Sequence, residues 1–364
     1  MYAIGPPFRA EHVGSLLRPR RLKNAFGAFQ ANEITRGELN ETIEDCIAQA
    51  IMLQEDCGMR SITDGEFRRG SWFLGFVDAV DGLTTKPATF NFSGDHGAWQ
   101  CAYADGKLKR SRGITVPEFD FIKDRTARMA KVTMPSPSSM HFYRGDEAAD
   151  KDVYSDIDAL FEDLVEIYRQ EIAALDQAGC EYIQLDEVPI AMLCDPQVQD
   201  NVRKRGEDPL ALVDRYIAAI NAALDGRPKD MTVGLHMCRG NYKGQWMAEG
   251  GYAPVAEKLF RGAEVDAFFL EYDSERAGDF TPLKAMPEDK LVVLGLVSTK
   301  TPELEAPDAL KRRIDDAAKF VPLERLAISP QCGFASSAGG NPVSEDDERR
   351  KLTLVADVAA DVWG

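Results

Sequence analysis

Five short apolar runs in the second half of the chain decide the fold: EYIQLDEV (181–188), TVGLHMC (232–238), AFFLEYD (267–273), LVVLGLVS (291–298) and LAISPQCG (326–333). Each run is rich in aliphatic or aromatic residues and closes on polar ones, which is typical of a strand buried on both faces. The segments between them carry apolar residues three or four positions apart, and this spacing predicts helices. Alternating strands and helices predict an α/β fold built on a parallel sheet.

The first half of the chain extends the same pattern. Three further strand candidates are FRAEHVGS (8–15), SITDGEF (61–67) and KVTMPSP (131–137), which makes eight in all. We expect the helices at 37–57, 155–178, 208–225, 250–262, 303–319 and 345–362. Eight strands alternating with helices predict a (β/α)8 TIM barrel, although a doubly wound open sheet also alternates in this way. The barrel is favoured because reactive residues stand at the carboxyl ends of nearly all the strands, and a barrel gathers those ends on one face.

Two stretches exceed this minimal pattern. Residues 70–122 are long for one strand-to-helix connection and carry the turn sequences FNFSGDHG and YADGKLKR, so we expect a β-hairpin insertion after the second strand, covering the barrel mouth. The Gly- and Ser-rich stretch 333–350 is expected to be a flexible loop beside the active site. We therefore expect one barrel domain over 1–364, with the insertion at about 70–122.

Composition narrows the function classes. The 364 residues carry a formal charge of −17, which repels phosphate backbones and anionic membranes, so neither nucleic acid nor a membrane is an expected partner. The opening MYAIGPPFRAEHVG lacks the features of a secretory signal, and seven cysteines in a long chain fit a reducing compartment. We expect a cytoplasmic protein in which most cysteines, Cys46 and Cys180 among them, are core residues. The sequence leaves a homo-oligomer open.

The pair His236 and Cys238 is the sharpest local signal. Residues i and i+2 of a strand point to the same side, so an imidazole and a thiolate can meet at one point. Taken alone, the pair is more often a core histidine and a buried cysteine. In a barrel, however, Glu271 and Cys332 reach the same rim, and a carboxylate in a very apolar strand needs a partner. His, Cys, Glu and Cys together favour Zn2+ over calcium or magnesium, because thiolates are soft ligands.

The charge of such a centre points to a chemistry. Zinc with two thiolates and one carboxylate carries about −1, which suits holding a reactive thiolate better than activating water. A closed structural zinc site is the alternative, but such sites usually draw their ligands from short knuckles, and these four are scattered along the chain.

Spaced motifs along almost the whole chain, from about 9 to 360, carry a family resemblance: HVGSLLRP, DGEFRRGSW, YIQLDEVP, LHMCRGN, FFLEYD, LGLVSTKTPELE and SPQCGF. In this order they resemble the C-terminal catalytic barrel of cobalamin-independent methionine synthase, and more closely its stand-alone single-barrel relatives. The resemblance implies that His236, Cys238, Glu271 and Cys332 bind zinc. It also implies homocysteine contacts at five positions: Val13, Gly14, Ser15, Glu66 and Asp186.

The chemistry of these positions agrees with the resemblance. Glu66 and Asp186 offer carboxylates to an ammonium group, and the backbone at Gly14 and Ser15 offers N–H donors to a carboxylate. For Glu66, a salt bridge with Arg18, Arg68 or Arg69 is an equally good interpretation.

Other positions depart from the family pattern. Lys300 stands where the full-length enzyme has a histidine proton donor, and it is either a replacement acid or a solvated lysine. Met192 stands where that enzyme has a folate-contacting glutamate, which puts a folate donor in doubt. Six aromatic residues near expected loops form either a platform for a flat ligand or ordinary packing, with Trp72 the best candidate for the site: Trp72, Phe73, Phe76, Trp99, Tyr242 and Trp246.

The sequence thus predicts a zinc-dependent methyltransferase that converts homocysteine to methionine. The donor is methyltetrahydrofolate, a methyl-corrinoid or a small methylated compound. Two alternatives remain. One is a zinc-dependent thiol alkyltransferase of the epoxyalkane:coenzyme M transferase type, for which Arg18, Arg68 and Arg239 would bind the sulfonate. The other is a non-catalytic zinc-stabilised barrel that binds a thiol or a methylated ligand.

Overall fold

A parallel sheet of six strands forms the centre of the molecule. The computed structural model describes residues 5–93 and 99–364, and within them the sheet order is β10-β9-β8-β7-β6-β5 with every neighbouring pair parallel. The strand bounds are β5 Val132–Pro135, β6 Tyr182–Asp186, β7 Thr232–Met237, β8 Ala267–Glu271, β9 Leu291–Val297 and β10 Leu326–Pro330. The five apolar runs of the second half of the chain contain strands β6 to β10 of this sheet.

Short segments from the first half of the chain lie at both edges of this sheet, in the arrangement of a (β/α)8 barrel. Ala10 forms a parallel bridge with Ile328 of β10, and the Glu11 N–H donates to Ile328 O over 2.9 Å. At the other edge, β4 (Met129–Ala130) runs into β5 and pairs in parallel with β1 (Ser61–Ile62). The remaining seam lies between the segment of Ala10 and β1, where the Ser61 hydroxyl donates to Glu11 Oε2 over 2.7 Å. The expected barrel is confirmed, with its first strand reduced to a single bridge.

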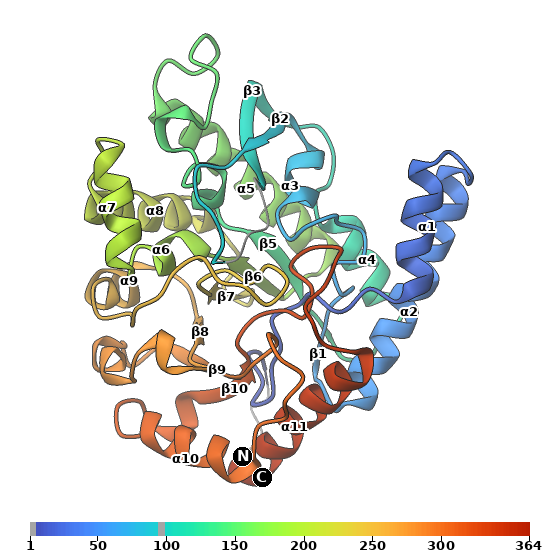
Figure 1. Cartoon of the computed structure of the whole chain (residues 1–364), viewed down its shortest axis with the longest axis vertical. Coiled ribbons are helices and arrows are strands. Elements are labelled where there is room, and N and C mark those ends of the chain that lie inside the picture. The colour runs from blue at the N-terminus through green and yellow to red at the C-terminus, as the bar shows by residue number, and fades with distance from the viewer. Residues whose placement is uncertain (1–4, 94–98) are drawn as a thin grey trace.

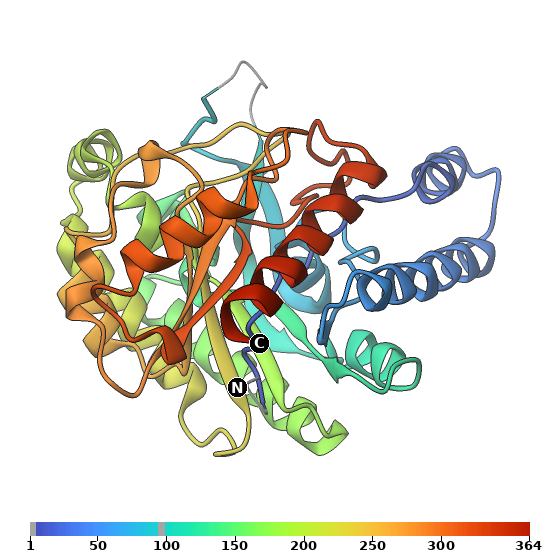
Figure 2. The ribbon, with the colours of Figure 1, turned by 90° about the horizontal axis from the view of Figure 1, so that it is seen from below.

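Helices surround the strands (Figure 1). Their bounds are α1 Arg20–Gln30, α2 Arg36–Asp56, α3 Leu74–Ala79, α4 Val116–Lys123, α5 Ile157–Ala178, α6 Val188–Met192, α7 Pro196–Lys204, α8 Pro209–Leu224, α9 Ala256–Gly262, α10 Pro307–Ala317 and α11 Glu345–Trp363. The six expected helices correspond to α2, α5, α8, α9, α10 and α11. Figure 2 shows α1 and α2 extending away from the barrel on one side. No helix in the described part of the chain is long and apolar enough to cross a membrane.

The expected hairpin insertion is also present. Strands β2 (Val80–Pro87) and β3 (Gln100–Arg110) pair in antiparallel register from Val80↔Arg110 to Pro87↔Gln100. The turn sequence FNFSGDHG lies between the two strands, and residues 94–98 lie outside the described part of the chain. Because α3 precedes the hairpin and α4 follows it, the described residues of the 70–122 stretch stand between β1 and β5 at the barrel rim.

The barrel interior mixes apolar layers with one buried ion pair. Tyr182, Phe269 and Val293 pack together inside, with Ala267 and Ala327 beside them. The fully buried Lys131 side chain reaches Glu11 Oε2 at 3.2 Å and lies over the Tyr182 and Phe269 rings. A buried charge needs partners of this kind, because desolvation alone would cost several kcal/mol.

Candidate metal and substrate site

One cavity of about 270 Å3 opens at the carboxyl ends of the strands. It is bounded by loops from both halves of the chain, by Ser71–Leu74 at the start of the insertion, and by Phe92 and Trp99 near the turn of the hairpin. Eight of the eleven residues expected to bind the metal or substrate or to take part in catalysis line it: Val13, Ser15, Glu66, Trp72, Asp186, His236, Cys238 and Cys332. The barrel therefore brings together positions separated by more than 300 residues, as its topology predicts.

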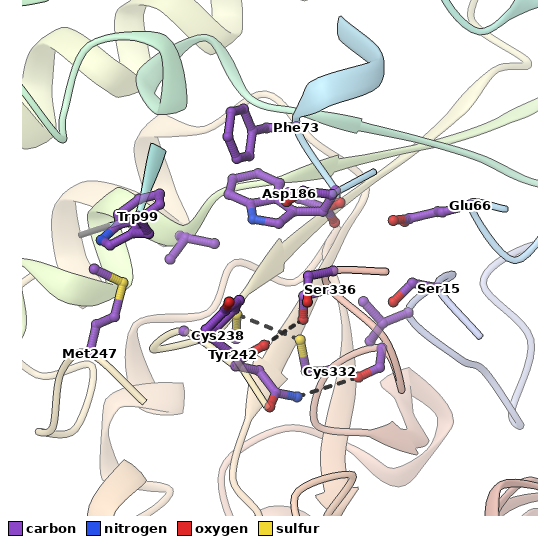
Figure 3. A pocket seen from close by; sticks show the side chains of 18 of the residues that line it. Ser15, Glu66, Phe73, Trp99, Asp186, Cys238, Tyr242, Met247, Cys332 and Ser336 are labelled. Atoms are coloured by element: carbon purple, nitrogen blue, oxygen red, sulfur yellow. Dashed lines mark hydrogen bonds between the residues drawn. The ribbon is translucent and has the colours of Figure 1, made fainter. Parts of the chain in front are cut away.

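Three of the four expected metal ligands meet at this cavity. One ligand atom from each of His236, Cys238 and Cys332 lies within 4.8 Å of the others, and all three residues are buried. The two sulfur atoms are 3.8 Å apart (Figure 3). Both ring nitrogens of His236 are buried, and the ring interacts with the Cys332 thiol. A buried imidazole beside two thiols is a donor set suited to Zn2+.

The two thiols differ in acidity. The hydrogen bond between the sulfur atoms lowers the pKa of Cys332 well below its usual value and raises the pKa of Cys238 well above it. Burial opposes ionisation of both. The pair therefore gives up one proton readily and the second with difficulty, and a bound cation removes that difficulty because metals bind the thiolate form.

Glu271, the fourth expected ligand, does not join the group of three. It ends β8, and its fully buried carboxylate accepts the Arg239 N–H at 2.7 Å and the Arg276 guanidinium at 2.6 Å. Burial raises its pKa, but the neighbouring cations, Lys300 first, lower it well below the usual value. The neighbouring cations thus favour the ionised form of Glu271, which lies next to the backbone that follows Cys238.

Lys300 is neither a solvated lysine nor a residue of the cavity wall. Its Nζ lies 3.1 Å from Glu271 Oε1 and 3.2 Å from Asp273 Oδ2, and its side chain is 8% exposed. Burial lowers its pKa, but these two carboxylates raise it above the usual value. These contacts make Lys300 the counter-ion of Glu271 and do not favour it as a proton donor.

Glu66 stands in a strained turn that directs it to the cavity. It has a left-handed backbone with φ of +61°, which costs a residue with a side chain about 1–2 kcal/mol. Two contacts hold the turn: the Glu66 N–H donates to Asp64 Oδ1 at 2.8 Å, and Arg18 Nη2 donates to Glu66 O at 2.8 Å. This turn is also why the predicted strand 61–67 ends at Ile62. Strain kept in place by such contacts is typical of functional positions.

Hydrogen bonds and charges fix the Glu66 carboxylate. Oε1 accepts the Thr133 hydroxyl at 2.8 Å and lies 3.7 Å from Arg69 Nη1, while the buried Oε2 has no partner in the described structure. Burial raises the pKa of Glu66, and Arg69 opposes that effect. The expected salt bridge and the expected cavity position are therefore both present. Arg69 is itself held by Glu118, whose pKa burial raises to about 7.

Asp186 faces the cavity from the end of β6. Its Oδ1 accepts the Gln184 amide at 2.8 Å, and the same amide donates to Val13 O at 2.6 Å. Burial raises the pKa of Asp186 to about 7. An ammonium group beside Asp186 and Glu66 would stabilise the ionised form of both carboxyls.

Two glycines let the chain approach this corner of the cavity closely. A Cβ on Gly14, which has φ of +135°, would lie 2.6 Å from Thr133 Cγ2. A Cβ on Gly333 would lie 1.9 Å from Ser15 Oγ. Both contacts require glycine. Gly14, unlike its neighbours Val13 and Ser15, does not line the cavity.

Aromatic residues line much of the remaining wall. Trp72, Phe73, Trp99 and Tyr242 line the cavity, as expected of site aromatics, whereas Phe76 is core and Trp246 lines a separate open hollow. Trp99 packs edge-to-face on Tyr143 at 4.7 Å, and Phe92 lies 5.1 Å from Tyr242. Figure 3 shows Trp99 and Met247 on the side opposite Glu66 and Ser15, with the two cysteines between these sides.

Several wall residues were not foreseen: Phe92, Tyr143, Asn241, Met247, Ser336 and Ser337. Asn241 and Ser336 stand within or beside the recognised motifs LHMCRGN and SPQCGF, a signal that could have identified them. Tyr143 and Met247 carry no sequence signal. The 333–350 stretch, expected to be a flexible loop, contributes Ser336 and Ser337 and is tied to the insertion by the Trp72 N–H, which donates to Ser336 O at 2.9 Å.

The arginines considered for an anionic substrate are used elsewhere. Arg18 Nη2 donates to Arg69 O at 2.6 Å, Arg239 Nε donates to Gly250 O at 2.7 Å, and Arg68 lies near Glu44. None of the three lines the described cavity.

Comparison with known proteins agrees with this geometry. Residues 8–359 match the family model described as the catalytic domain of cobalamin-independent synthase. The uncharacterized Bacillus subtilis protein YxjH is 38% identical over 361 residues, covering 98% of this chain and 95% of that protein. Methionine synthase of Pyrococcus abyssi is 28% identical over 328 residues, covering 88% and 85%. A solved structure of a Listeria monocytogenes protein assigned as a vitamin-B12 independent methionine synthase superposes with a TM-score of 0.78, at 36% identity over 98% of each chain.

Proposed function

The chain belongs to the family of cobalamin-independent methionine synthase catalytic domains, and on that premise we propose that it is a zinc-dependent S-methyltransferase. The proposed acceptor is a small thiol, homocysteine, and the product is methionine. The proposed donor is a methylfolate, a methyl-corrinoid or a small methylated compound. One observation carries the proposal: a His–Cys–Cys group lies in the same small cavity as two carboxyls suited to an amino group.

The residues present fit a zinc ion. His236, Cys238 and Cys332 would hold it, because their donor atoms already converge in one buried group. Glu271 is the proposed fourth ligand because its carboxylate lies close to Cys238: it accepts a hydrogen bond from the N–H of Arg239, the next residue in the chain. When bound, zinc would lower the pKa of the substrate thiol, so that the nucleophile is a thiolate near neutral pH.

The protein's own residues bind and orient the amino acid. Glu66 and Asp186 accept the substrate ammonium group, and the backbone and hydroxyl of Ser15 bind its carboxylate, with Val13 and Gly14 shaping that corner. Trp72 covers the substrate from the insertion. The cavity holds both reactants in line beside the sulfur atoms, so they need not meet by diffusion in the correct orientation. This positioning lowers the activation free energy of methyl transfer by several kcal/mol.

We propose a supporting role for Lys300: it fixes the position and charge of Glu271. We also propose that the 70–122 insertion and the barrel act as one catalytic domain over 1–364, because Trp72 and Trp99 supply cavity walls.

The two alternatives are less well supported. A coenzyme M-type substrate carries a sulfonate, and the described cavity wall holds two carboxyls but no lysine or arginine. A non-catalytic barrel does not explain why a strained turn directs Glu66 into a cavity that also holds the metal-ligating group.

The test is methionine formation. Zinc-loaded protein is incubated with homocysteine and, in separate reactions, each class of methyl donor, and methionine is quantified by mass spectrometry. The proposal expects turnover with at least one donor and its loss on chelation. No methionine from any donor with metal-replete protein would overturn it.

A further inference from the structure

The two ends of the cavity differ in chemistry. Ser15 and Glu66 form a polar end, and Trp99 and Met247 stand on the opposite side with the cysteine sulfur atoms between (Figure 3). In the proposed reaction the amino acid occupies the polar end, so the methyl donor must approach from the aromatic end. The inference that follows rests on the proposed function.

The aromatic end is built from rings that contact one another. Trp99 meets Tyr143 edge-to-face at 4.7 Å, Phe92 meets Trp99 at 5.6 Å, and Phe92 meets Tyr242 at 5.1 Å. All four rings line the cavity. Aromatic faces carry a negative quadrupole, and desolvated cations bind them favourably.

The charged carboxyl side chains that line the cavity have one sign. The nearest cations stand outside the lining: Arg69, 3.7 Å from Glu66, and Lys243, whose Nζ lies 5.2 Å from the centre of the Tyr242 ring. Among its described lining residues the acidic ones are Glu66 and Asp186, and none is a lysine or an arginine. The whole chain carries −17, which attracts cations and repels anions. An anionic donor would therefore meet no cationic side chain in the described wall. The cavity, about 270 Å3, is slightly smaller than the ~300–1,000 Å3 of sites for drug-sized ligands, which favours two small reactants.

We propose that the methyl donor is a small onium compound, a methylated sulfonium or quaternary ammonium, whose cationic head binds against the aromatic rings of this cavity. The homocysteine thiolate attacks the methyl carbon, the new sulfur–carbon bond forms, and the bond from that carbon to the onium atom breaks. Its electron pair leaves with a neutral thioether or tertiary amine. The leaving group needs no proton, which agrees with Lys300 lying in its ion pair with Glu271 and Asp273.

A donor panel tests the proposal directly. Zinc-loaded protein and isotopically labelled homocysteine are combined with S-methylmethionine, dimethylsulfoniopropionate or glycine betaine, and in parallel with methyltetrahydrofolate or methylcobalamin. Labelled methionine is quantified, because S-methylmethionine itself releases unlabelled methionine as its leaving thioether. We expect methionine from at least one onium donor, at a rate at least tenfold above the folate and corrinoid reactions. Methionine from folate or corrinoid alone would leave the proposed function standing and overturn this inference. Methionine from no donor would overturn both.

Binding without turnover supplies a second readout. Choline and its uncharged isostere 3,3-dimethylbutan-1-ol are titrated against the zinc-loaded protein without homocysteine, by calorimetry. We expect choline to bind at least tenfold more tightly, and Trp99→Leu to reduce that ratio. The control Phe29→Leu, on the projecting α1, should keep it. Equal binding of the two compounds to the wild type would contradict the proposal, whether or not the Trp99 variant folds.

Discussion

Thr133→Val tests how the barrel positions Glu66. The Thr133 hydroxyl donates to Glu66 Oε1 at 2.8 Å and accepts from Arg69 Nη1 at 3.1 Å. Valine keeps the side-chain shape and removes both hydrogen bonds. A hydrogen bond to a charged group contributes about 1.5–3 kcal/mol, so losing the one that orients Glu66 should lower kcat/KM for homocysteine about 10- to 100-fold. Most of the change should be in KM, because Glu66 is proposed to bind the amino group and not to react.

The assay is steady-state methionine formation at a saturating donor concentration, with the zinc content of each variant measured first. Thr133→Ser is the matched variant, since it restores the hydroxyl while losing the methyl that packs on Gly14. Serine should recover most of the lost kcat/KM. A valine variant within twofold of the wild type, or a serine variant as poor as valine, would refute the positioning role.

Two further predictions concern buried charges. Burial raises the pKa of Glu348 from 4.5 to about 8, so the native state favours the neutral acid and loses stability as the pH rises between those values. At about 1.36 kcal/mol per pKa unit, Glu348→Gln should therefore be more stable than the wild type by roughly 2–3 kcal/mol at pH 7 and little different at pH 4.5. The free energy of unfolding is measured in urea at both pH values. An equal difference at both pH values would contradict this prediction. Lys300→Met removes a counter-ion of Glu271 and should lower the free energy of unfolding by roughly 3 kcal/mol. The control Lys229→Met, at an exposed position, should change it very little. A Lys300 variant as stable as the wild type would show that the ion pair does not stabilise the fold.

Periodicity predicted alternating strands and helices, and the reactive residues at the strand ends favoured the barrel over an open sheet. The runs that became β6 to β10 are apolar on both faces, and such runs form strands in almost any packing. The first two strands were predicted too long because tertiary contacts end them. Hydrogen bonds from the Glu66 N–H to Asp64 and from Arg18 to Glu66 O favour a left-handed turn over continued strand. No local pattern reveals a contact with Arg18, almost fifty residues away.

The convergence of three ligand candidates was predictable, because each of them stands in a motif at the end of a strand. His236, Cys238 and Cys332 were predicted from their types and from the barrel topology, which gathers strand ends. The surroundings of Glu271 were not predicted, because the guanidinium of Arg276 reaches it from a short helix after β8, and Lys300 reaches it from the loop after β9. Tyr143 and Met247 enter the cavity wall through loop packing, which leaves no periodic trace in sequence.

The central claim is one metal centre shared by the ends of two distant strands, and zinc content tests it most directly. Zinc per chain is measured by mass spectrometry on the wild type, Cys238→Ser, Cys332→Ser and the control Cys46→Ser, all prepared under reducing conditions. Cys46 is a buried core cysteine of α2, outside the cavity. We predict about one zinc in the wild type and in the control, and clear loss in both site variants. A wild type that stays metal-free after zinc is added, or site variants that keep their zinc, would contradict the account.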